Sequence, residues 1–397
     1  MRFGKAYLTE EFETKRGKYR IAGTRFAPKK GGSGVPVIIS HGFMGNRKTV
    51  EEYAVMMTEM GYTAYTFDFV GGGPKIDSGG DMTEMSVLTE CADLFSVMEY
   101  VKKRHAQSAG KLVLMGCSQG GFVSAMLAAK RKEEVGKLIL FYPALCIPDD
   151  ANRGQMLLFR FDPANVPDVI PAMGGKLQIG RKYVEDAMSL DPYEAIRGYR
   201  GDVLIVHGTA DRVVDYAYSE KAEAAYGGNA QLFAIRNAGH GFRREEDAVA
   251  KETVRQFLAG RREVLTVDVR TSKPVLERKG LNSTLTIPFD GFAKGPFFEG
   301  VIQAGAQDVQ KRKGMRPVEF CAQYSLRGVD VRGQSCTVEI VNRTADGTHW
   351  IPEVRTDSEE LGFLNGAYCE AVLENRKTGP VVHIFTGLPE GRAIPVR

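Results

Sequence analysis

The sequence predicts an α/β domain with a doubly wound, mostly parallel sheet, followed by an all-β domain of the barrel type. Between residues 35 and 260, short apolar runs alternate with helix-forming segments, as in parallel strands linked by crossover helices. Beyond residue 262, β-like runs are separated by Gly, Asp, Asn and Lys, without a convincing helical stretch. The length of 397 residues suits two such domains.

The elements of the first domain follow one another in a strand and helix rhythm. The expected strands are short and apolar, as in a parallel sheet that is covered on both faces. The longest expected helix, residues 83–104, carries apolar side chains on one face. Two further β-like runs precede residue 28. The other expected strands are residues 35–40, 62–69, 111–115, 137–142, 202–206 and 231–235, and the other expected helices are residues 48–60, 122–129 and 245–258.

We place the domain boundary at residue 262, so that residues 1–262 form the α/β domain and residues 263–397 the all-β barrel domain. The rhythm of the first domain breaks between residues 144 and 197, a segment with five prolines. An insertion after a strand of a parallel sheet lies over the carboxyl ends of the strands, where ligands bind. We therefore expect this segment to act as a lid.

The stretch "GCSQG", residues 116–120, has the pattern Gly-x-Ser-x-Gly between an expected strand and an expected helix. A sharp turn at this place forces the serine into a strained backbone conformation and exposes its hydroxyl group. Glycine is needed on either side because strand and helix approach each other closely. Ser118 is therefore the candidate nucleophile, and Cys117 is expected to be a small buried residue.

A serine hydroxyl needs a base to take its proton, and the base needs an acid that orients it. In this type of fold the order along the chain is serine, acid, histidine. Asp211 follows the expected strand 202–206, and His240 follows the next one, so both lie at the same edge of the sheet. We predict a Ser118, Asp211, His240 triad, with Asp215 as the rival acid.

The tetrahedral intermediate of acyl transfer needs two hydrogen-bond donors for its oxyanion. The position after the nucleophile supplies one, the backbone N–H of Gln119. The loop after the strand 35–40 reads "HGFMGN" and supplies the other, the N–H of Phe43. His41 and His207 lie in His-Gly pairs at strand ends, where we expect them to hydrogen-bond and pack loops rather than react.

The composition excludes several classes of protein. Basic residues are scattered and the net charge is only +4, so nucleic acid is not an expected partner. No apolar run suggests a signal peptide or a membrane span. The six cysteines form no Cys-x-x-Cys pair and are expected to be free thiols in a reducing cytoplasm. His349 and His383 have no evident cluster of partners, so no metal site and no cofactor are predicted.

With these residues in place, the chain resembles the α/β-hydrolase family and, within it, the bacterial cinnamoyl (feruloyl) esterases. The resemblance implies hydrolysis of hydroxycinnamoyl esters without a cofactor, with Ser118, Asp211 and His240 as the triad and Phe43 and Gln119 at the oxyanion hole. The β region resembles a family of small all-β barrels of unknown function. The motifs that carry these resemblances are "HGFMGN", "FDFVGGG", "GCSQGG", "HGTADRVV", "AGHGF", the lid segment "FRFDPANVPDVIP", and, in the barrel, "GPFFEGVI" and "TDSEELGFLNGAY".

The chain departs from the esterase pattern at two places. The loop after Phe69 reads Gly-Gly-Gly-Pro where many members have Gly-His-Gly, and Cys117 stands where histidine is frequent. Neither departure removes a catalytic group, although both lie near the pocket.

The triad alone leaves several functions open. A thioesterase, a peptidase or a lactonase would use the same residues, because specificity lies in the lid and the pocket. A binding protein on a hydrolase scaffold is the non-enzymatic alternative. A small-molecule ester is the expected partner, and the strand edges of the β domain leave a homo-oligomer open.

Overall fold

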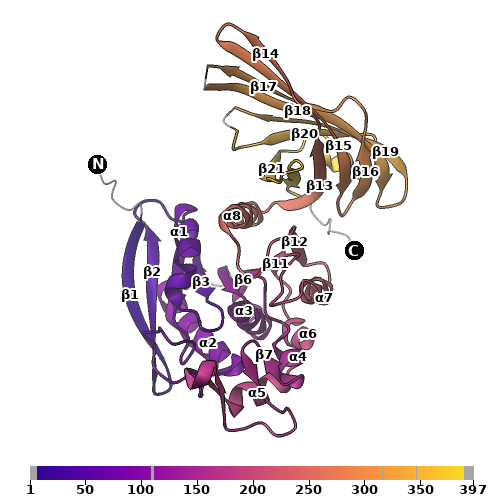
Figure 1. The fold of residues 1–397 in the computed structure, drawn as a ribbon. Coiled ribbons are helices and arrows are strands. Elements are labelled where there is room, and N and C mark those ends of the chain that lie inside the picture. Colours follow the sequence, from indigo (N-terminus) through magenta and orange to yellow (C-terminus); the bar gives the residue numbers. More distant parts are fainter. Residues whose placement is uncertain (1–6, 109–110, 315, 346, 389–397) are drawn as a thin grey trace. The chain divides into compact units, whose positions relative to one another are not determined.

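The computed structural model describes residues 7–108, 111–314, 316–345 and 347–388. The chain folds into two compact units, Met1–Phe242 and Arg243–Arg397 (Figure 1). Each unit is considered separately below.

The first unit is built on an eight-stranded sheet with the order β1-β2-β4-β3-β5-β6-β11-β12. The pairs from β4 to β12 are parallel, whereas β1 and β2 form an antiparallel hairpin that joins the edge at β4. The central strands are buried at nearly every position, in agreement with their apolar sequences. The strands are β1 (Tyr7–Arg16), β2 (Tyr19–Pro28), β3 (Pro36–Ser40), β4 (Thr63–Phe67), β5 (Leu112–Cys117), β6 (Val135–Phe141), β11 (Asp202–Gly208) and β12 (Ala230–Ile235).

Helices cross over between the parallel strands. In the longest, α2, Ser86 and Thr89 form a capping box at the N-terminus, and one apolar face is buried. This face packs against α3 and the core of the unit. The helices of the crossovers are α1 (Glu51–Glu59), α2 (Val87–Arg104), α3 (Gln119–Lys130) and α7 (Ala217–Tyr226), with the short helices η1 (Arg47–Val50) and η2 (Ala106–Ser108).

The expected lid is an insertion between β6 and β11, which are neighbours in the sheet. It contains short helices and two small antiparallel strand pairs, so it does not extend the main sheet. Its elements are α4 (Ile147–Asn152), β7 (Gln155–Met156), β8 (Phe159–Arg160), β9 (Val169–Ala172), η3 (Met173–Gly175), β10 (Leu177–Gly180), α5 (Arg181–Met188) and α6 (Pro192–Ile196).

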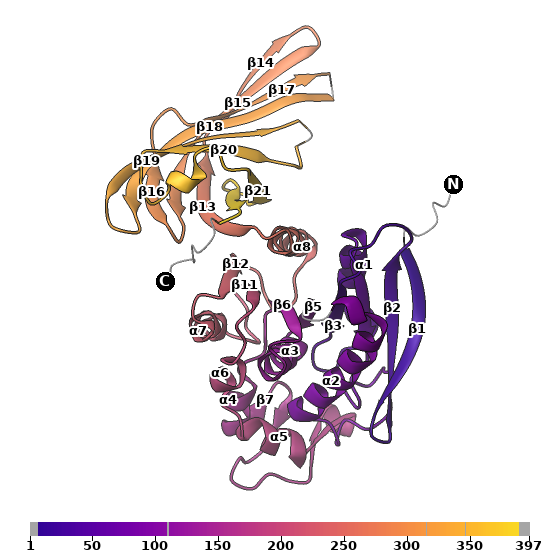
Figure 2. The same cartoon turned by 180° about the vertical axis from the view of Figure 1, so that it is seen from behind.

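The second unit begins with helix α8 (Arg244–Leu258) and continues as a β-barrel (Figures 1 and 2). The main path of strands is β20-β19-β18-β16-β15-β13-β22-β21, and β14 and β17 run beside β15 as extensions of β13 and β16. The two ends of this path meet where Trp350 pairs with Ala371 through a 2.9 Å backbone hydrogen bond. This bridge closes the barrel.

The barrel has its apolar core among the alternate, inward-facing residues of these strands. The strands are β13 (Arg262–Thr271), β14 (Val275–Lys279), β15 (Asn282–Lys294), β16 (Phe298–Ile302), β17 (Gln307–Lys313), β18 (Arg316–Asp330), β19 (Ser335–Thr344), β20 (Ile351–Thr356), β21 (Cys369–Glu374) and β22 (Val381–Thr386), with the short helix η4 (Gly362–Leu364) before β21.

The predicted architecture is confirmed: an α/β domain with an insertion, followed by a β-barrel. The boundary at residue 262 remains a prediction. The two compact units divide between Phe242 and Arg243, so that α8 belongs to the second unit. Strands β14 and β17 were not predicted, since their sequences, "VLERK" and "QDVQKRK", are largely polar and exposed. Over the described residues, no helix combines the length and the apolar character that crossing a membrane requires.

His383 has partners that the sequence did not predict. Its Nδ1 lies 2.7 Å from Glu263 Oε1 and its Nε2 lies 3.6 Å from Glu374 Oε2; His383 and Glu374 are buried, and the Glu263 side chain is 11% exposed. Burial opposes protonation, but the two carboxylates outweigh it and raise the pKa of His383 to about 9. A buried charged cluster therefore lies in the barrel.

Candidate active site

Ser118 lies in the turn between β5 and α3, with φ 54° and ψ −121°. This is the strained conformation that the pattern Gly-x-Ser-x-Gly predicts. A Cβ atom at Gly116 would lie 2.2 Å from the carbonyl oxygen of Gly120, and one at Gly120 would lie 2.2 Å from that of His41. Both glycines are thus required by the close approach of strand and helix. Cys117 is 5% exposed, as expected for a small buried residue.

Hydrogen bonds join Ser118, His240 and Asp211. His240 Nε2 lies 3.0 Å from Ser118 Oγ, and His240 Nδ1 lies 2.8 Å from Asp211 Oδ2. Because a carboxylate only accepts, Nδ1 carries the proton of the neutral ring, and Nε2 accepts from the serine hydroxyl. The three predicted residues come from loops that follow β5, β11 and β12, so the carboxyl ends of three parallel strands bring them together.

Asp211 is surrounded by donors. Its Oδ1 accepts hydrogen bonds from the N–H groups of Val213 (2.8 Å) and Val214 (3.0 Å), and its Oδ2 lies 3.1 Å from His207 Nε2 in addition to His240. Burial alone would raise the pKa of Asp211, but the bonds from His207, His240 and Val214 outweigh it and lower the pKa below its usual range. These hydrogen bonds therefore favour the ionised carboxylate.

His207 has a role that the sequence did not predict in detail. Its Nε2 faces two acceptors, Asp211 Oδ2 and the carbonyl oxygen of Val214 (3.0 Å), while its Nδ1 lies 2.7 Å from Ser219 Oγ. The proton is therefore on Nε2, and Nδ1 accepts from the serine hydroxyl. This fully buried histidine is thus a second ring that holds Asp211 Oδ2, in addition to His240.

The rival acid, Asp215, lies elsewhere. Its carboxylate accepts from the N–H of Ala217 (2.9 Å) at the start of α7. His41 is also accounted for, because its Nδ1 donates to the carbonyl of Gly42 (2.8 Å) and its Nε2 accepts from the N–H of Phe69 (3.2 Å). Burial lowers the pKa of His41, so it packs the loops as a neutral ring, as expected.

The expected oxyanion donors, Phe43 and Gln119, lie beside Ser118 in the lining of one pocket. The side chain of Gln119 is fixed on both sides, because its Nε2 donates to Glu90 Oε2 (2.8 Å) and its Oε1 accepts from the Tyr183 hydroxyl. Burial raises the pKa of Glu90 to about 8. No sequence pattern indicated this arrangement, which joins α2, the elbow and the lid helix α5.

The pocket beside Ser118 is apolar and is covered by the lid. The ring of Phe43 contacts two aromatic rings of the lid, Phe159 (centroids 6.1 Å apart) and Tyr183 (5.8 Å). The enclosed volume is only about 40 Å³. The other lining residues are Ala144, Cys146, Ile147, Asp150, Met156, Leu157, Ile179, Val213 and Val214.

No group of three or more His, Cys, Asp and Glu side chains is placed to hold a metal ion within the part of the chain that the structure describes. The site thus offers a serine, a histidine at hydrogen-bond distance from it, a carboxylate that orients the histidine, and backbone donors. This set of groups is suited to acyl transfer through a covalent intermediate.

Comparison with known proteins finds two family models that match the part of the chain that holds this site. A family model described as serine aminopeptidase, S33, matches residues 35–198, and one described as TAP-like protein matches residues 188–264. An uncharacterized protein of Mycobacterium tuberculosis (strain H37Rv) is 24% identical over 240 residues, which are 60% of this chain and 75% of that protein.

Two solved structures of Est1E from Butyrivibrio proteoclasticus are similar to 62% and 63% of this chain. The one described as ferulic acid bound to Est1E is 26% identical, has a TM-score of 0.57, and covers 62% of this chain and 98% of Est1E. The other is 25% identical with a TM-score of 0.55, and covers 63% of this chain and 97% of Est1E. Together with the parallel sheet and the serine elbow, these matches identify the N-terminal part of this chain as an α/β-hydrolase.

Proposed function

We propose that this protein is a serine carboxylic ester hydrolase that acts on hydroxycinnamoyl esters, such as feruloyl, coumaroyl and caffeoyl esters. The observation that carries the proposal is the unbroken run of hydrogen bonds from Ser118 through His240 to Asp211. A base within 3.0 Å of the serine oxygen, itself oriented by a buried carboxylate, is the arrangement that activates a serine nucleophile.

In the proposed reaction, His240 Nε2 takes the proton from Ser118 Oγ while the oxygen attacks the ester carbonyl. The N–H groups of Phe43 and Gln119 bind the oxyanion, and Asp211 stabilises the imidazolium ion. His240 then gives its proton to the leaving alcohol. Water repeats these steps on the acyl-enzyme and releases the acid, so that no cofactor takes part.

The aromatic residues of the pocket favour a substrate with a planar aromatic acyl group. Phe43, Phe159 and Tyr183 provide ring faces and edges next to the nucleophile. Ferulic acid is bound in the similar protein Est1E. The enclosed volume of about 40 Å³ is far below the roughly 300–1,000 Å³ of ordinary ligand pockets. We therefore propose that the lid opens to admit the acyl group, with the hairpin β7–β8 as the part that moves.

A peptidase is the second candidate function, because the family model that matches residues 35–198 is described as a serine aminopeptidase. Thioesters and lactones would be attacked by the same groups. A non-catalytic binding protein would not need a base at hydrogen-bond distance from a serine in a strained turn. All six cysteines are free thiols, which supports our proposal that the enzyme works in a reducing cytoplasm.

The test separates the mechanism from the substrate. Ser118→Ala and Asp211→Asn are expected to lower kcat on p-nitrophenyl ferulate by about 10⁴-fold or more, whereas Asp215→Asn, the matched control, is expected to retain full activity. Circular dichroism checks that each variant is folded. A folded Ser118→Ala variant with undiminished turnover would refute the mechanism.

The substrate assignment is tested with a constant leaving group. We expect kcat/KM to be at least about tenfold higher for p-nitrophenyl ferulate than for p-nitrophenyl acetate, a difference of about 1.4 kcal/mol in transition-state binding. Equal values would refute the hydroxycinnamoyl assignment but leave the esterase intact. Faster turnover of aminoacyl p-nitroanilides would instead favour the peptidase.

A further inference from the structure

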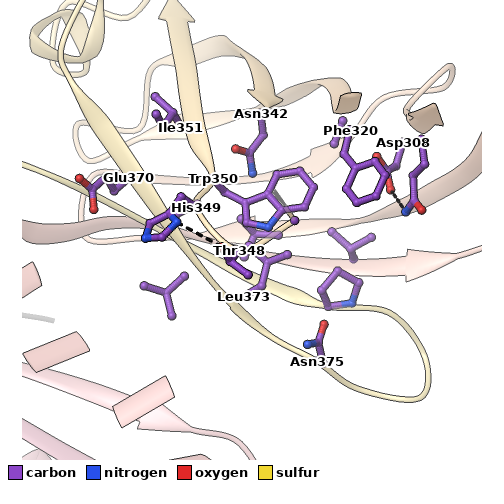
Figure 3. Close-up of a pocket in the computed structure, with 18 of the residues that line it drawn as sticks. Asp308, Phe320, Asn342, Thr348, His349, Trp350, Ile351, Glu370, Leu373 and Asn375 are labelled. Carbon is purple, nitrogen blue, oxygen red and sulfur yellow. Dashed lines mark hydrogen bonds between the residues drawn. The ribbon is translucent and has the colours of Figure 1, made fainter. Parts of the chain in front are cut away.

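The barrel of the second unit encloses a cavity of about 990 Å³, much larger than the pocket at Ser118. Its lining comes from α8 and from the strands β13, β15, β17, β18, β19, β20, β21 and β22. Figure 3 shows Phe320, Asn342 and Trp350 around this space. The volume lies at the upper end of the range of small-molecule sites, roughly 300–1,000 Å³.

Several barrel strands contribute to the core at one end and to the cavity at the other. On β19, the inward-facing residues Val338 and Ile340 belong to the core, whereas Asn342, the next inward position, lines the cavity. On β18, Leu326 belongs to the core, whereas Phe320 lines the cavity. The alternation of the strands thus continues into the cavity, but the side chains there leave the interior unfilled.

Three residues that line the cavity each carry a buried polar atom without a hydrogen-bond partner among the residues that the structure describes: Asp308 Oδ1, the Tyr324 hydroxyl and Asn342 Oδ1. Tyr324 and Asn342 are only 6% and 3% exposed. A buried polar group without a hydrogen-bond partner lowers the stability of the folded protein by about 1–3 kcal/mol, so three such groups destabilise the empty barrel. Two of them are acceptors and one is a hydroxyl, so the hydroxyl groups of a ligand are the kind of partner that suits all three.

The cavity wall is also aromatic. Trp350 and Phe320 line it, and Phe289 and Tyr324 form an edge-to-face pair with centroids 5.4 Å apart. Such rings provide apolar area and defined stacking geometry for a flat ligand. The wall therefore combines aromatic faces with isolated polar atoms, as is typical of ligand sites.

The charges on the wall disfavour an anion. Four carboxylate side chains line the cavity, against Arg312 and His349. Burial raises the pKa of Asp308, whose other oxygen accepts from Gln310 Nε2 at 2.8 Å. Glu252 and Glu370 are paired with Arg255 and Arg261, so Glu245 and Asp308 are the main groups that would repel a carboxylate ligand, whereas an uncharged hydroxyl could donate to them. The four acidic residues are Glu245, Glu252, Asp308 and Glu370.

From this wall we infer that the barrel is a second binding site, which takes an uncharged aromatic molecule bearing hydroxyl groups. The ring system lies against Trp350 and Phe320, and the hydroxyl groups bond to Asn342, Tyr324 and Asp308. This inference does not depend on the proposed esterase, because all lining residues belong to the second unit.

The test measures binding of 2,6-dihydroxynaphthalene to the full chain. The control ligand is 6-hydroxy-2-naphthoate, an anionic analogue of similar size and shape. Trp350 is the only tryptophan of the chain, so 5-fluorotryptophan labelling gives one ¹⁹F signal, from the wall of the cavity. We expect saturable binding of the diol in calorimetry, a matching shift of the ¹⁹F signal, and at least about tenfold weaker binding of the carboxylate.

Asn342→Leu and Tyr324→Phe each remove one unpartnered atom. We expect each to weaken binding of the diol by about 2- to 12-fold, while the thermal stability of the ligand-free protein stays the same or rises. Tyr226→Phe is the matched control, because it removes an unpartnered, buried hydroxyl in the first unit. It is expected to leave binding unchanged.

Three results would overturn the inference. They are the absence of a ¹⁹F shift up to millimolar diol, tighter binding of the carboxylate than of the diol, and unchanged affinity in both cavity variants. The absence of a ¹⁹F shift would mean that the cavity holds only water. None of them bears on the activity of Ser118, which is measured separately.

Discussion

Glu90 makes the first unit sensitive to pH in a way that one substitution should remove. The side chain is 1% exposed, its Oε2 accepts from Gln119, and its Oε1 has no hydrogen-bond partner among the described residues. Burial, with a smaller contribution from the charge of Asp93, raises its pKa from 4.5 to about 8. Glu90→Gln keeps the shape and an acceptor for Gln119 but cannot ionise.

The sign and size of the effect follow from linkage. Because the folded state binds the proton more tightly, the stabilisation is complete below pH 4.5 and is lost as the pH rises to about 8. At about 1.4 kcal/mol for each pKa unit, the total is about 5 kcal/mol. Between pH 5.5 and 7.5, we expect wild type to lose about 2 to 3 kcal/mol more of its free energy of unfolding than Glu90→Gln.

Urea unfolding followed at 222 nm, where the helices of the first unit contribute most, measures this difference. Glu99→Gln, a partly exposed position on the same helix, is the matched control and should keep the pH dependence of the wild type. Equal slopes with pH for wild type and Glu90→Gln would refute the reasoning, since Glu90 would then be ionised in the folded protein.

Two other predictions concern the elbow and the barrel. Gly120→Ala places a Cβ atom 2.2 Å from a backbone carbonyl oxygen and should lower the free energy of unfolding by about 3 kcal/mol. Gly362→Ala is the control and should not lower it, because no described atom lies within 4 Å of the added Cβ. Equal melting temperatures of the two variants would contradict this prediction. The carboxylates around His383, mainly Glu263, raise its pKa, so that protonated His383 stabilises the folded barrel. This stabilisation is complete below pH 6.5, and about 3 kcal/mol of the free energy of unfolding is lost as the pH rises to about 9. Unfolding followed by Trp350 fluorescence at pH 6 and pH 9.5 should show this loss of stability in wild type and not in His383→Gln. The same loss in both proteins would exclude His383 as its source.

The sequence predicted those features that depend on local pattern and chain order. A strand, a turn and a helix around Ser118 fixed the position of the elbow, and the loops after two later strands located Asp211 and His240. The structure places these three residues within hydrogen-bond distance, while their catalytic roles remain predictions.

Contacts between distant polar side chains could not be predicted in this way. Glu90, Gln119 and Tyr183 belong to three separate elements, and no spacing or periodicity indicates that they meet. The same is true of the second contact of Asp211, with His207. Strand β17 was missed for another reason, because its polar residues line a cavity on one side and face solvent on the other, without an apolar run.

The bridge between Trp350 and Ala371 has a consequence for association with other molecules. An open sheet has two edge strands whose free backbone groups can pair with another chain, which leads to aggregation or to sheet-to-sheet dimers. In the barrel, β20 and β21 would be these edges, but the bridge turns them toward each other. Among the described strands, β14 pairs with β15 alone and is exposed along its length, so the edge that another chain could pair with is at β14 rather than at β20 or β21.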